Sequence, residues 1–441
     1  MYSEAEVRAK MDTLEWEIAK ACINGVDMVP DDSDLPHIME CAKQIFELSQ
    51  GRNEVRFDRQ GRPSIMVNFF NSREARLDYL SGGGSYFSDS EYGAENSSYA
   101  YNIHPAFIVD GNPVNVRRIG KYLDIRYDGK NYHQSLPGFD PACGTGGVTM
   151  SYSGLASACD AINSGTKRED GDAVENMTIA DYGYLGLLSV RKGFCARGND
   201  SQGLSGQVTS EHGVPAAGYS NYRYHNKFVL TKTGSGPDSW RHDGSPFGVS
   251  DVRGNTGCLV HGFQMLEGRL LYVPNNDLCS KASASGLASE LAETSSAYKA
   301  LKSDGTWLEQ TTTEESMFYD YKEDMTDVTS GSHAFEIATS LTHQQTSSDP
   351  YGGISLSSLA ARDGVTIPLY MRLMLNAPLL TGNPTGYAYM RNAASMRRVS
   401  LRGGDWNGGV SGAGFGYSSG GNWGFGTWSN YDGGGRVASY C

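Results

Sequence analysis

The sequence Arg397-Arg-Val-Ser-Leu-Arg-Gly-Gly-Asp-Trp406 leads into the most unusual segment of this 441-residue chain. Residues 407–435, 29 positions, include 12 glycines interleaved with aromatic and asparagine side chains, and they contain no Lys, Arg, Glu, Gln or Met. The quoted stretch and Gly435-Arg-Val-Ala438 both carry strand-forming residues, so we expect each end of the glycine-rich segment to be anchored in a sheet. Composition alone leaves low-complexity disorder open as the alternative.

The composition of this segment is typical of binding loops. Flat aromatic side chains give contact area at a small cost in conformational entropy, while Gly, Ser and Asn adapt to a partner. The alternative is that the aromatic residues pack on the scaffold; Trp406 we expect in the core. The candidate ligand-binding residues are Asp405, Asn407, Tyr417, Ser418, Ser419, Asn422, Trp423, Phe425, Thr427, Trp428, Ser429, Asn430, Tyr431 and Asp432.

Charge and cysteine usage exclude several classes of protein. The net charge of −13 argues against a nucleic-acid binder with a broad basic face. No apolar run reaches the length of about 18–20 residues that spans a bilayer. The N-terminus lacks the basic start and apolar centre of a secretory signal, so we expect no export by the general pathway. The eight cysteines form no Cys-x-x-Cys pair, which argues against a metal cluster or redox pair.

The first fifty residues are predicted to form two amphipathic helices. In the first, one face carries Val7, Met11, Leu14, Ile18 and Cys22. The second is expected to begin at Asp34 as N-cap, with Pro36 in its first turn. Its apolar stripe would consist of Leu35, Ile38, Met39, Ala42, Ile45 and Phe46. Two short helices bury little by themselves, so we assign residues 1–53 as an assembly segment that packs on the rest of the chain, a second copy or a larger assembly.

The remainder is predicted to be α+β. Residues 54–58 and 64–70 alternate as strands around a turn at Gln60-Gly61-Arg62-Pro63, and 54–103 continue as an extended connector. From residue 104 short strands predominate. Helices are expected at 155–164, at 179–192 with Gly193 as C-cap, and at 281–302 within an insertion at about 281–335.

Several short blocks accompany the C-terminal one. They are His104-Pro-Ala-Phe-Ile-Val-Asp-Gly111 with Ile119-Gly-Lys-Tyr122, Ser135-Leu-Pro-Gly138, Ala180-Asp-Tyr-Gly-Tyr-Leu-Gly-Leu-Leu188, Ala196-Arg-Gly-Asn-Asp200, Trp240-Arg-His-Asp-Gly244, Gly248-Val-Ser-Asp-Val-Arg-Gly-Asn255 and Pro274-Asn-Asn276. In this order they resemble the formylglycine-generating-enzyme-like variety of the C-type lectin fold. More closely, they resemble the variable proteins of diversity-generating retroelements, many of which are phage receptor-binding proteins. The resemblance covers roughly residues 54–441.

This resemblance implies a function. It implies a C-type lectin fold over residues 104–441 that binds a host cell-surface protein or glycan through a variable region at about 402–436. The protein would be a virion component at the tip of a phage tail fibre, made in the host cytoplasm, contacting other tail-fibre proteins and forming a homo-oligomer, by analogy a trimer. No nucleic acid partner, membrane insertion or cofactor is implied. Candidate ligands of a structural calcium are Asp243, Asp251, Asp277 and Asp405, since hard oxygen donors suit that ion.

The amino acids absent from the variable region fit the retroelement interpretation. Mutagenesis at adenines in asparagine codons leaves codons that end in a pyrimidine, and these cannot encode Lys, Glu, Gln, Met or Trp. The first four are absent from residues 407–435, so Trp406, Trp423 and Trp428 are expected to be fixed positions. A glycine-rich loop can also lack these residues by chance.

Two alternatives of other classes are a formylglycine-generating-type oxidase and a cellular lectin or adhesin. The oxidases need a pair of redox-active cysteines near the C-terminal part of the fold, where this chain offers only Cys279 and Cys441, which are not paired in sequence. The chain also has Gly257-Cys258-Leu259 where the family has a tryptophan-glutamate-tryptophan run. His242-Asp243 is a possible dyad, but beside Trp240 and Gly244 we expect it to brace a turn. We therefore expect binding without catalysis.

Overall fold

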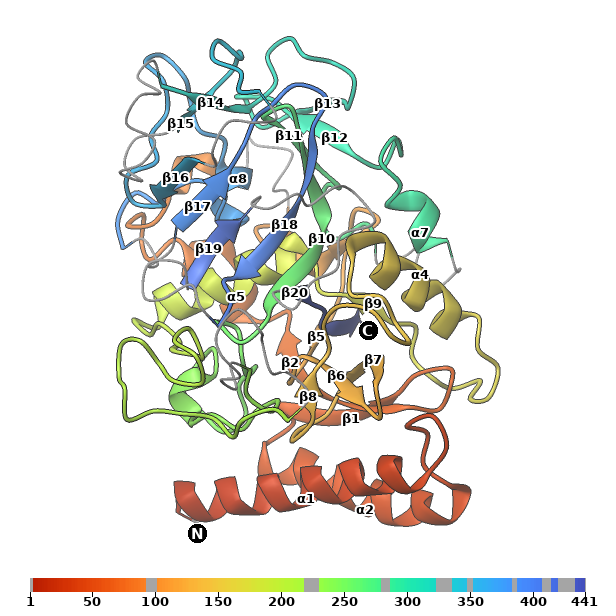
Figure 1. Ribbon diagram of the computed structural model, residues 1–441. Helices are drawn as coiled ribbons and strands as arrows, with labels where there is room; N and C mark the ends of the chain where they lie inside the picture. Colours follow the sequence, from red (N-terminus) through yellow and green to blue (C-terminus); the bar gives the residue numbers. More distant parts are fainter. Residues whose placement is uncertain are drawn as a thin grey trace.

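The computed structural model describes residues 3–92, 101–217, 230–278, 286–322, 335–346, 352–382, 387–406, 414–418 and 433–440. These residues form an α+β fold of short, mostly antiparallel strands with helices packed around them (Figure 1). Within these ranges, no helix is long and apolar enough to cross a membrane. The α-helices are α1 (Glu4–Asn24), α2 (Leu35–Leu48), α3 (Leu77–Leu80), α4 (Tyr152–Asn163), α5 (Ile179–Arg191), α7 (Leu287–Glu290) and α8 (Leu369–Leu373).

Helices α1 and α2 lie side by side across one end of the molecule (Figure 1). A capping box between Ser3 and Glu6 begins α1, because each side chain accepts the other's backbone N–H. The predicted apolar face of α1 is confirmed: Met11, Ile18 and Cys22 are buried. They share one core with side chains of the body, including Phe57, Ile65, Ile125 and Phe139.

The predicted start of α2 is confirmed, because Asp34 is the N-cap residue and Pro36 lies in the first turn. The Asp34 side chain makes no capping hydrogen bond, and the residue also ends a short 3-10 turn, Asp32–Asp34. The predicted stripe is wrong in one respect, because it is too wide. Ile38 and Ile45 are buried, whereas Met39 and Phe46 are 52% and 48% exposed. Only one narrow face of α2 contacts α1 and the body.

The smaller of the two main sheets brings the first two strands of the chain together with the last described strand. Its strand order is β1 (Asn53–Phe57), β2 (Pro63–Phe70), β5 (Val116–Gly120), β21 (Val437–Tyr440) and β9 (Glu175–Asn176). The antiparallel β1–β2 hairpin confirms the strands predicted at 54–58 and 64–70. At the far side β21 pairs with β5, Ala438 opposite Ile119, so the last described strand is held inside the body.

The larger sheet contains the strands around the glycine-rich segment. Its order is β13 (Trp307–Glu309), β12 (Lys299–Leu301), β11 (Arg269–Tyr272), β10 (Gly257–Leu266), β18 (Arg397–Gly403), β19 (Gly414–Ser418), β17 (Tyr387–Met390) and β16 (Gly352–Ser355), with β14 (Phe318–Tyr321), β15 (Phe335–Ala338) and β20 (Gly433–Gly434) attached. The smaller sheets contain β3 (Ile108–Val109) and β4 (Asn112–Pro113), and β6 (Asp124–Tyr127), β7 (Lys130–Ser135) and β8 (Asp140–Pro141).

Two of the three helices predicted beyond residue 104 are confirmed. Helix α4 covers the prediction at 155–164, and α5 covers 179–192, with Gly193 at φ +66 just after the C-cap residue Lys192. The helix predicted over 281–302 is wrong for the described residues. Only Leu287–Glu290 are helical, and Lys299–Leu301 form strand β12.

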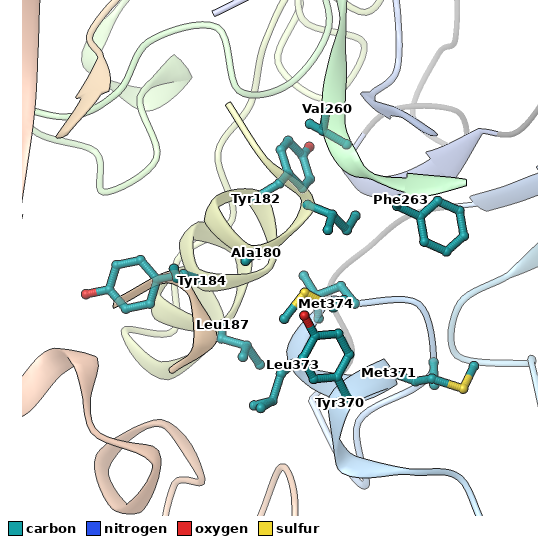
Figure 2. Close-up of a cluster of buried hydrophobic side chains, with 14 of the residues drawn as sticks. Ala180, Tyr182, Tyr184, Leu187, Val260, Phe263, Tyr370, Met371, Leu373 and Met374 are labelled. Atoms are coloured by element: carbon teal, nitrogen blue, oxygen red, sulfur yellow. The ribbon is translucent and has the colours of Figure 1, made fainter. Parts of the chain in front are cut away.

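The main hydrophobic core lies between α5, α8 and β10. Figure 2 shows Leu187 of α5 directed toward Leu373 and Tyr370 of α8, with Phe263 of β10 on the other side. The two helices approach closely at Gly183, where an added Cβ would meet the Leu373 carbonyl oxygen at 2.2 Å. Glycine is therefore required at this helix crossing.

Candidate functional site

The predicted binding residues fall in the C-terminal segment 404–436, of which the structure describes residues 404–406, 414–418 and 433–436. Asp405 is half-buried, and Tyr417 and Ser418 belong to strand β19. The other candidates lie outside the described residues; they are Asn407, Ser419, Asn422, Trp423, Phe425, Thr427, Trp428, Ser429, Asn430, Tyr431 and Asp432. The site is therefore defined here by the framework that holds residues 404–436.

Strand β19 fixes the middle of the segment within the larger sheet. On one side it runs antiparallel to β18, with Tyr417 opposite Arg402 and Ser418 opposite Leu401. On the other side it runs parallel to β17, with Ser418 opposite Tyr389. Backbone hydrogen bonds on both sides therefore hold β19 in the sheet as far as Ser418.

The segment returns to the framework at β20, beside the start of β10. Gly433 pairs with Gly257 and Gly434 with Cys258 in parallel. Space here is limited: a Cβ on Gly434 would meet Thr256 Oγ1 at 2.7 Å, and one on Gly435 would meet Asp124 Oδ2 at 2.4 Å. Some of the glycines at this end are thus explained by close packing against neighbouring residues.

Arg402 holds strand β18, which precedes the segment 404–436, against neighbouring elements. Its side chain is fully buried and donates to the carbonyl oxygens of Met374 (3.2 Å) and Leu375 (3.3 Å) and to the Asn376 side chain. Its guanidinium also lies over the ring of Tyr182, 5.7 Å from the ring centre. One arginine therefore ties β18 to the chain that follows α8 and to α5.

Arg436 has the same role at the other end of the segment, between β20 and β21. It is fully buried and donates to the carbonyl oxygens of Gly120 (2.9 Å), Ser250 (2.7 Å) and Asp251 (3.2 Å). Its backbone N–H donates to Asn176 Oδ1 at 3.0 Å. Hydrogen bonds to a charged group are stronger than neutral ones, so the guanidinium contacts hold the returning chain firmly. The expectation that Gly435-Arg-Val-Ala438 is anchored in a sheet is confirmed, because β21 follows directly.

Trp406 lies where the described chain enters the segment. It is only 3% exposed and packs with Cys143, Ala216 and Leu230. Its backbone N–H donates to the Asn255 carbonyl oxygen at 3.1 Å, and its carbonyl oxygen accepts from the Gln202 N–H at 2.8 Å. The prediction that Trp406 belongs to the core is confirmed.

Two polar turns, at residues 199–200 and 253–255, contact each other next to Trp406. Asp200 forms an ion pair with Arg253 at 2.8 Å, and both are buried. Asn255 donates to the Thr231 carbonyl oxygen at 2.9 Å and accepts from its N–H at 3.0 Å. The backbones touch at Gly254, where a Cβ would meet the Asn199 carbonyl oxygen at 2.1 Å. Sequence reasoning singled out both turns as motifs but gave neither a role.

Two of the four carboxylates considered for calcium already have protein partners. Asp243 pairs with Arg52, and Asp251 accepts from the Gly234 N–H at 3.0 Å. Burial raises the pKa of Asp251, and it raises the pKa of Asp277 to about 6. Within the described ranges, no group of three or more His, Cys, Asp or Glu side chains is placed to hold a metal ion.

His242 and Asp243 brace a turn, as expected from the sequence. His242 Nδ1 accepts from the Val249 N–H at 2.8 Å, and the Asp243 carboxylate accepts from the N–H (3.1 Å) and hydroxyl (2.9 Å) of Ser245. The closest approach of His242 Nδ1 to Asp243 is 4.0 Å, too long for a hydrogen bond.

Six cysteines lie within the described ranges, and none of these six forms a disulfide there. Burial raises the pKa of Cys22 and of Cys258 to about 12, so both stay protonated at neutral pH. Cys279 and Cys441, the two positions considered for an oxidase, lie outside the described residues.

Comparison with known proteins found no matching family model and no matching curated protein.

Proposed function

We propose that this chain is a receptor-binding protein in which a C-type-lectin-like scaffold presents residues 404–436 to a host cell-surface protein or glycan. The observation that carries the proposal is the framework itself. Trp406 and Arg436 are buried where the segment leaves and rejoins the body, and β19 is held between two strands. A firmly held frame around a loop rich in Gly, Tyr, Trp and Asn is what a binding surface needs.

Contacts among the sequence blocks support the lectin-like part of the proposal. Asn276 donates to Asp181 Oδ1 (3.1 Å) and to the Ala106 carbonyl oxygen (3.1 Å), which joins three blocks. Arg436 joins the C-terminal block to the blocks that contain Gly120 and Ser250. Blocks far apart in sequence therefore meet around one core, as members of a common fold would.

Binding would rest on the aromatic side chains of the segment. Buried aromatic anchors dominate the energy of many interfaces, while Ser, Asn and Thr supply hydrogen bonds around them. The absence of Lys, Arg and Glu from residues 407–435 avoids the desolvation cost of unpaired charges. Several copies on one fibre, a trimer by analogy, would raise a modest affinity through avidity. No catalytic step is part of this proposal.

Replacement of Trp428 or Tyr431 by Ala tests the assignment of the binding surface. Each variant should lose about 2 kcal/mol or more of binding energy and keep the wild-type melting temperature, since these side chains would face the receptor. The measurement is adsorption of labelled full-length protein to a panel of bacterial strains, paired with a thermal melt. Tyr101→Ala, which removes a tyrosine that is 43% exposed elsewhere, is the control and should bind normally.

If the melting temperature of the Trp428 and Tyr431 variants drops while binding per folded molecule is unchanged, these residues belong to the core.

A genomic observation tests the retroelement assignment separately. A neighbouring reverse-transcriptase gene and a near-copy of the codons for residues 402–436, differing at adenines, should accompany this gene. Their absence would remove diversification from the proposal and leave a fixed binding surface.

A further inference from the structure

A cavity of about 450 Å³ opens between β2, α5 and the turn after His242. Its size is within the range of small-molecule sites in proteins. Its walls come from residues 52–74, 184–192 and 242–245, so it shares no residue with the segment 404–436. This cavity is therefore a separate feature of the molecule.

Two buried polar groups reach this cavity without a partner. Tyr184 and His242 are 1% and 2% exposed, and their rings pack against Phe69 at 5.6 and 5.4 Å between centres. Among the described residues, the Tyr184 hydroxyl and His242 Nε2 have no hydrogen-bond partner, while both side chains line the cavity. Figure 2 shows the Tyr184 hydroxyl pointing away from the apolar cluster of α5 and α8.

Both groups are hydrogen-bond donors. His242 Nδ1 accepts from the Val249 N–H, so in the neutral ring the proton is on Nε2. Burial lowers the pKa of His242 to about 4, which keeps the ring neutral at physiological pH. Neither the Tyr184 hydroxyl nor His242 Nε2 is fully enclosed, so each is open to donate a hydrogen bond to an oxygen atom bound in the cavity.

The rim of the cavity adds further donors. Arg52 pairs with Asp243 through one guanidinium nitrogen, and Lys192 pairs with Glu74 at 3.1 Å. An arginine has five N–H donors and a lysine three, so both retain unused donors beside the cavity. Asp243, in contrast, already accepts from Arg52 and Ser245. Phe70, which is 45% exposed, also lines the cavity and gives it apolar surface.

We propose that this cavity binds a small molecule that carries a carboxylate and an apolar body. The carboxylate oxygens would accept from the Tyr184 hydroxyl, His242 Nε2 and Lys192, and the apolar body would lie against Phe70. Acceptors also line the cavity, namely the unpartnered Asn68 Oδ1 and the carboxylates of Glu74 and Asp243, each of which pairs with a cation. The donors that remain open on Tyr184, His242, Arg52 and Lys192 outnumber these acceptors, which favours an anion. This proposal is independent of the receptor-binding function.

Benzoate, with benzyl alcohol as its neutral counterpart, tests the proposal on the full-length protein. Ligand-observed NMR titrations should detect benzoate binding and at least about tenfold weaker binding of benzyl alcohol. Tyr184→Phe removes only the hydroxyl, and Lys192→Gln removes only the rim charge. Each should weaken benzoate binding by about tenfold or more. Lys299→Gln is the matched control, because Lys299 forms a similar half-exposed ion pair with Glu309 (2.8 Å) and does not line the cavity.

Thermal melts separate binding from folding. Because the Tyr184 hydroxyl has no partner among the described residues, Tyr184→Phe should leave the melting temperature unchanged or slightly raised. The proposal is overturned if benzoate does not bind, if benzyl alcohol binds equally well, or if benzoate binds Tyr184→Phe and Lys192→Gln as well as it binds wild type. Equal weakening by Lys299→Gln would likewise overturn it, because the effect would then be one of overall charge.

Discussion

At the scale of single residues, buried arginines join parts of the chain that are far apart in sequence. Arg436 alone binds carbonyl oxygens from Gly120, Ser250 and Asp251. A carbonyl oxygen that is buried without a donor costs about 1–3 kcal/mol. The guanidinium therefore stabilises three backbone segments at once, which a lysine cannot match because it lacks the planar fork.

Arg436→Met should destabilise the protein by about 3 kcal/mol or more, since three buried carbonyl oxygens lose their donor. Urea denaturation measures the change in the free energy of unfolding. Arg436→Lys should be intermediate. As the control, Arg73→Met changes an exposed arginine and should cost less than about 0.5 kcal/mol. Equal effects of the two Met variants would show that the buried contacts contribute nothing.

Buried histidines make stability depend on pH. Burial lowers the pKa of His104 and of His242 to about 4 and that of His261 to about 3. Unfolding exposes them to water, where their pKa is about 6.5, so below that pH the unfolded chain binds more protons. Their contribution is complete above about pH 6.5 and is lost as pH falls toward about 4.

These three histidines should lower the free energy of unfolding between about pH 6.5 and pH 4.5, by as much as about 1.4 kcal/mol per pH unit for each ring. Buried His133 contributes with the opposite sign, because Asp124 raises its pKa against the effect of burial. Urea denaturation at a series of pH values measures this slope. His261→Gln should make the slope shallower, because the unfolded variant would bind about one proton fewer than the unfolded wild type. An unchanged slope in His261→Gln would contradict the buried, neutral state of that ring.

At the scale of elements, a buried ion pair holds α1 on the body. Glu15 of α1 accepts from Lys121 Nζ at 2.6 Å and from the Tyr122 hydroxyl, and Glu15 and Lys121 are fully buried. Burial lowers the pKa of Lys121 to about 8, while Glu15 acts in the opposite direction. Loss of Glu15 would leave a buried cation without its partner.

Glu15→Ala should therefore destabilise the protein by about 3–5 kcal/mol. Glu15→Gln, which keeps an oxygen acceptor, should cost less. Glu4→Ala, at an exposed position of the same helix, is the control and should be near neutral. Chemical denaturation of the three variants gives the comparison. A Glu15→Ala protein as stable as the Glu4→Ala control would mean that the pair only balances its own desolvation.

The elements differ in how well the sequence predicts them. Helix α5 was predictable because its apolar positions and Gly193 mark its length and its end. The stretch around Leu291 and Leu301 has helical spacing as well, but Leu301 faces the core from a strand, and periodicity over a short apolar run cannot separate the two.

The framework of the site was predictable only in part. Trp406 was correctly expected in the core, since a large aromatic at the end of a strand-like motif needs burial. Arg402 was not singled out, because it alternates with Val399 and Leu401, and alternation predicts a polar face in water. That face is instead covered by the chain after α8, a long-range contact that local sequence does not encode.

At the scale of the whole molecule, residues 1–53 and the body are energetically connected. Met11, Ile18 and Ile38 share one core with Phe57 and Ile65, and the Glu15–Lys121 pair crosses the same boundary. The outer face of α2 is different, because Met39 and Phe46 are largely exposed. Assembly through the N-terminal segment, if it follows the proposed function, would use this outer face and leave the inner one in place.

A protein comprising residues 54–441 should accordingly melt at a lower temperature than the full chain or aggregate, because its core is uncovered and Lys121 loses Glu15. The double variant Met39→Ser, Phe46→Ser should keep the melting temperature, since both side chains are exposed, but should lower the molar mass measured by light scattering if α2 mediates assembly. Equal melting temperatures for 54–441 and the full chain would show that the shared core adds nothing. If the double variant has the molar mass of the wild type, the outer face of α2 is not the assembly contact.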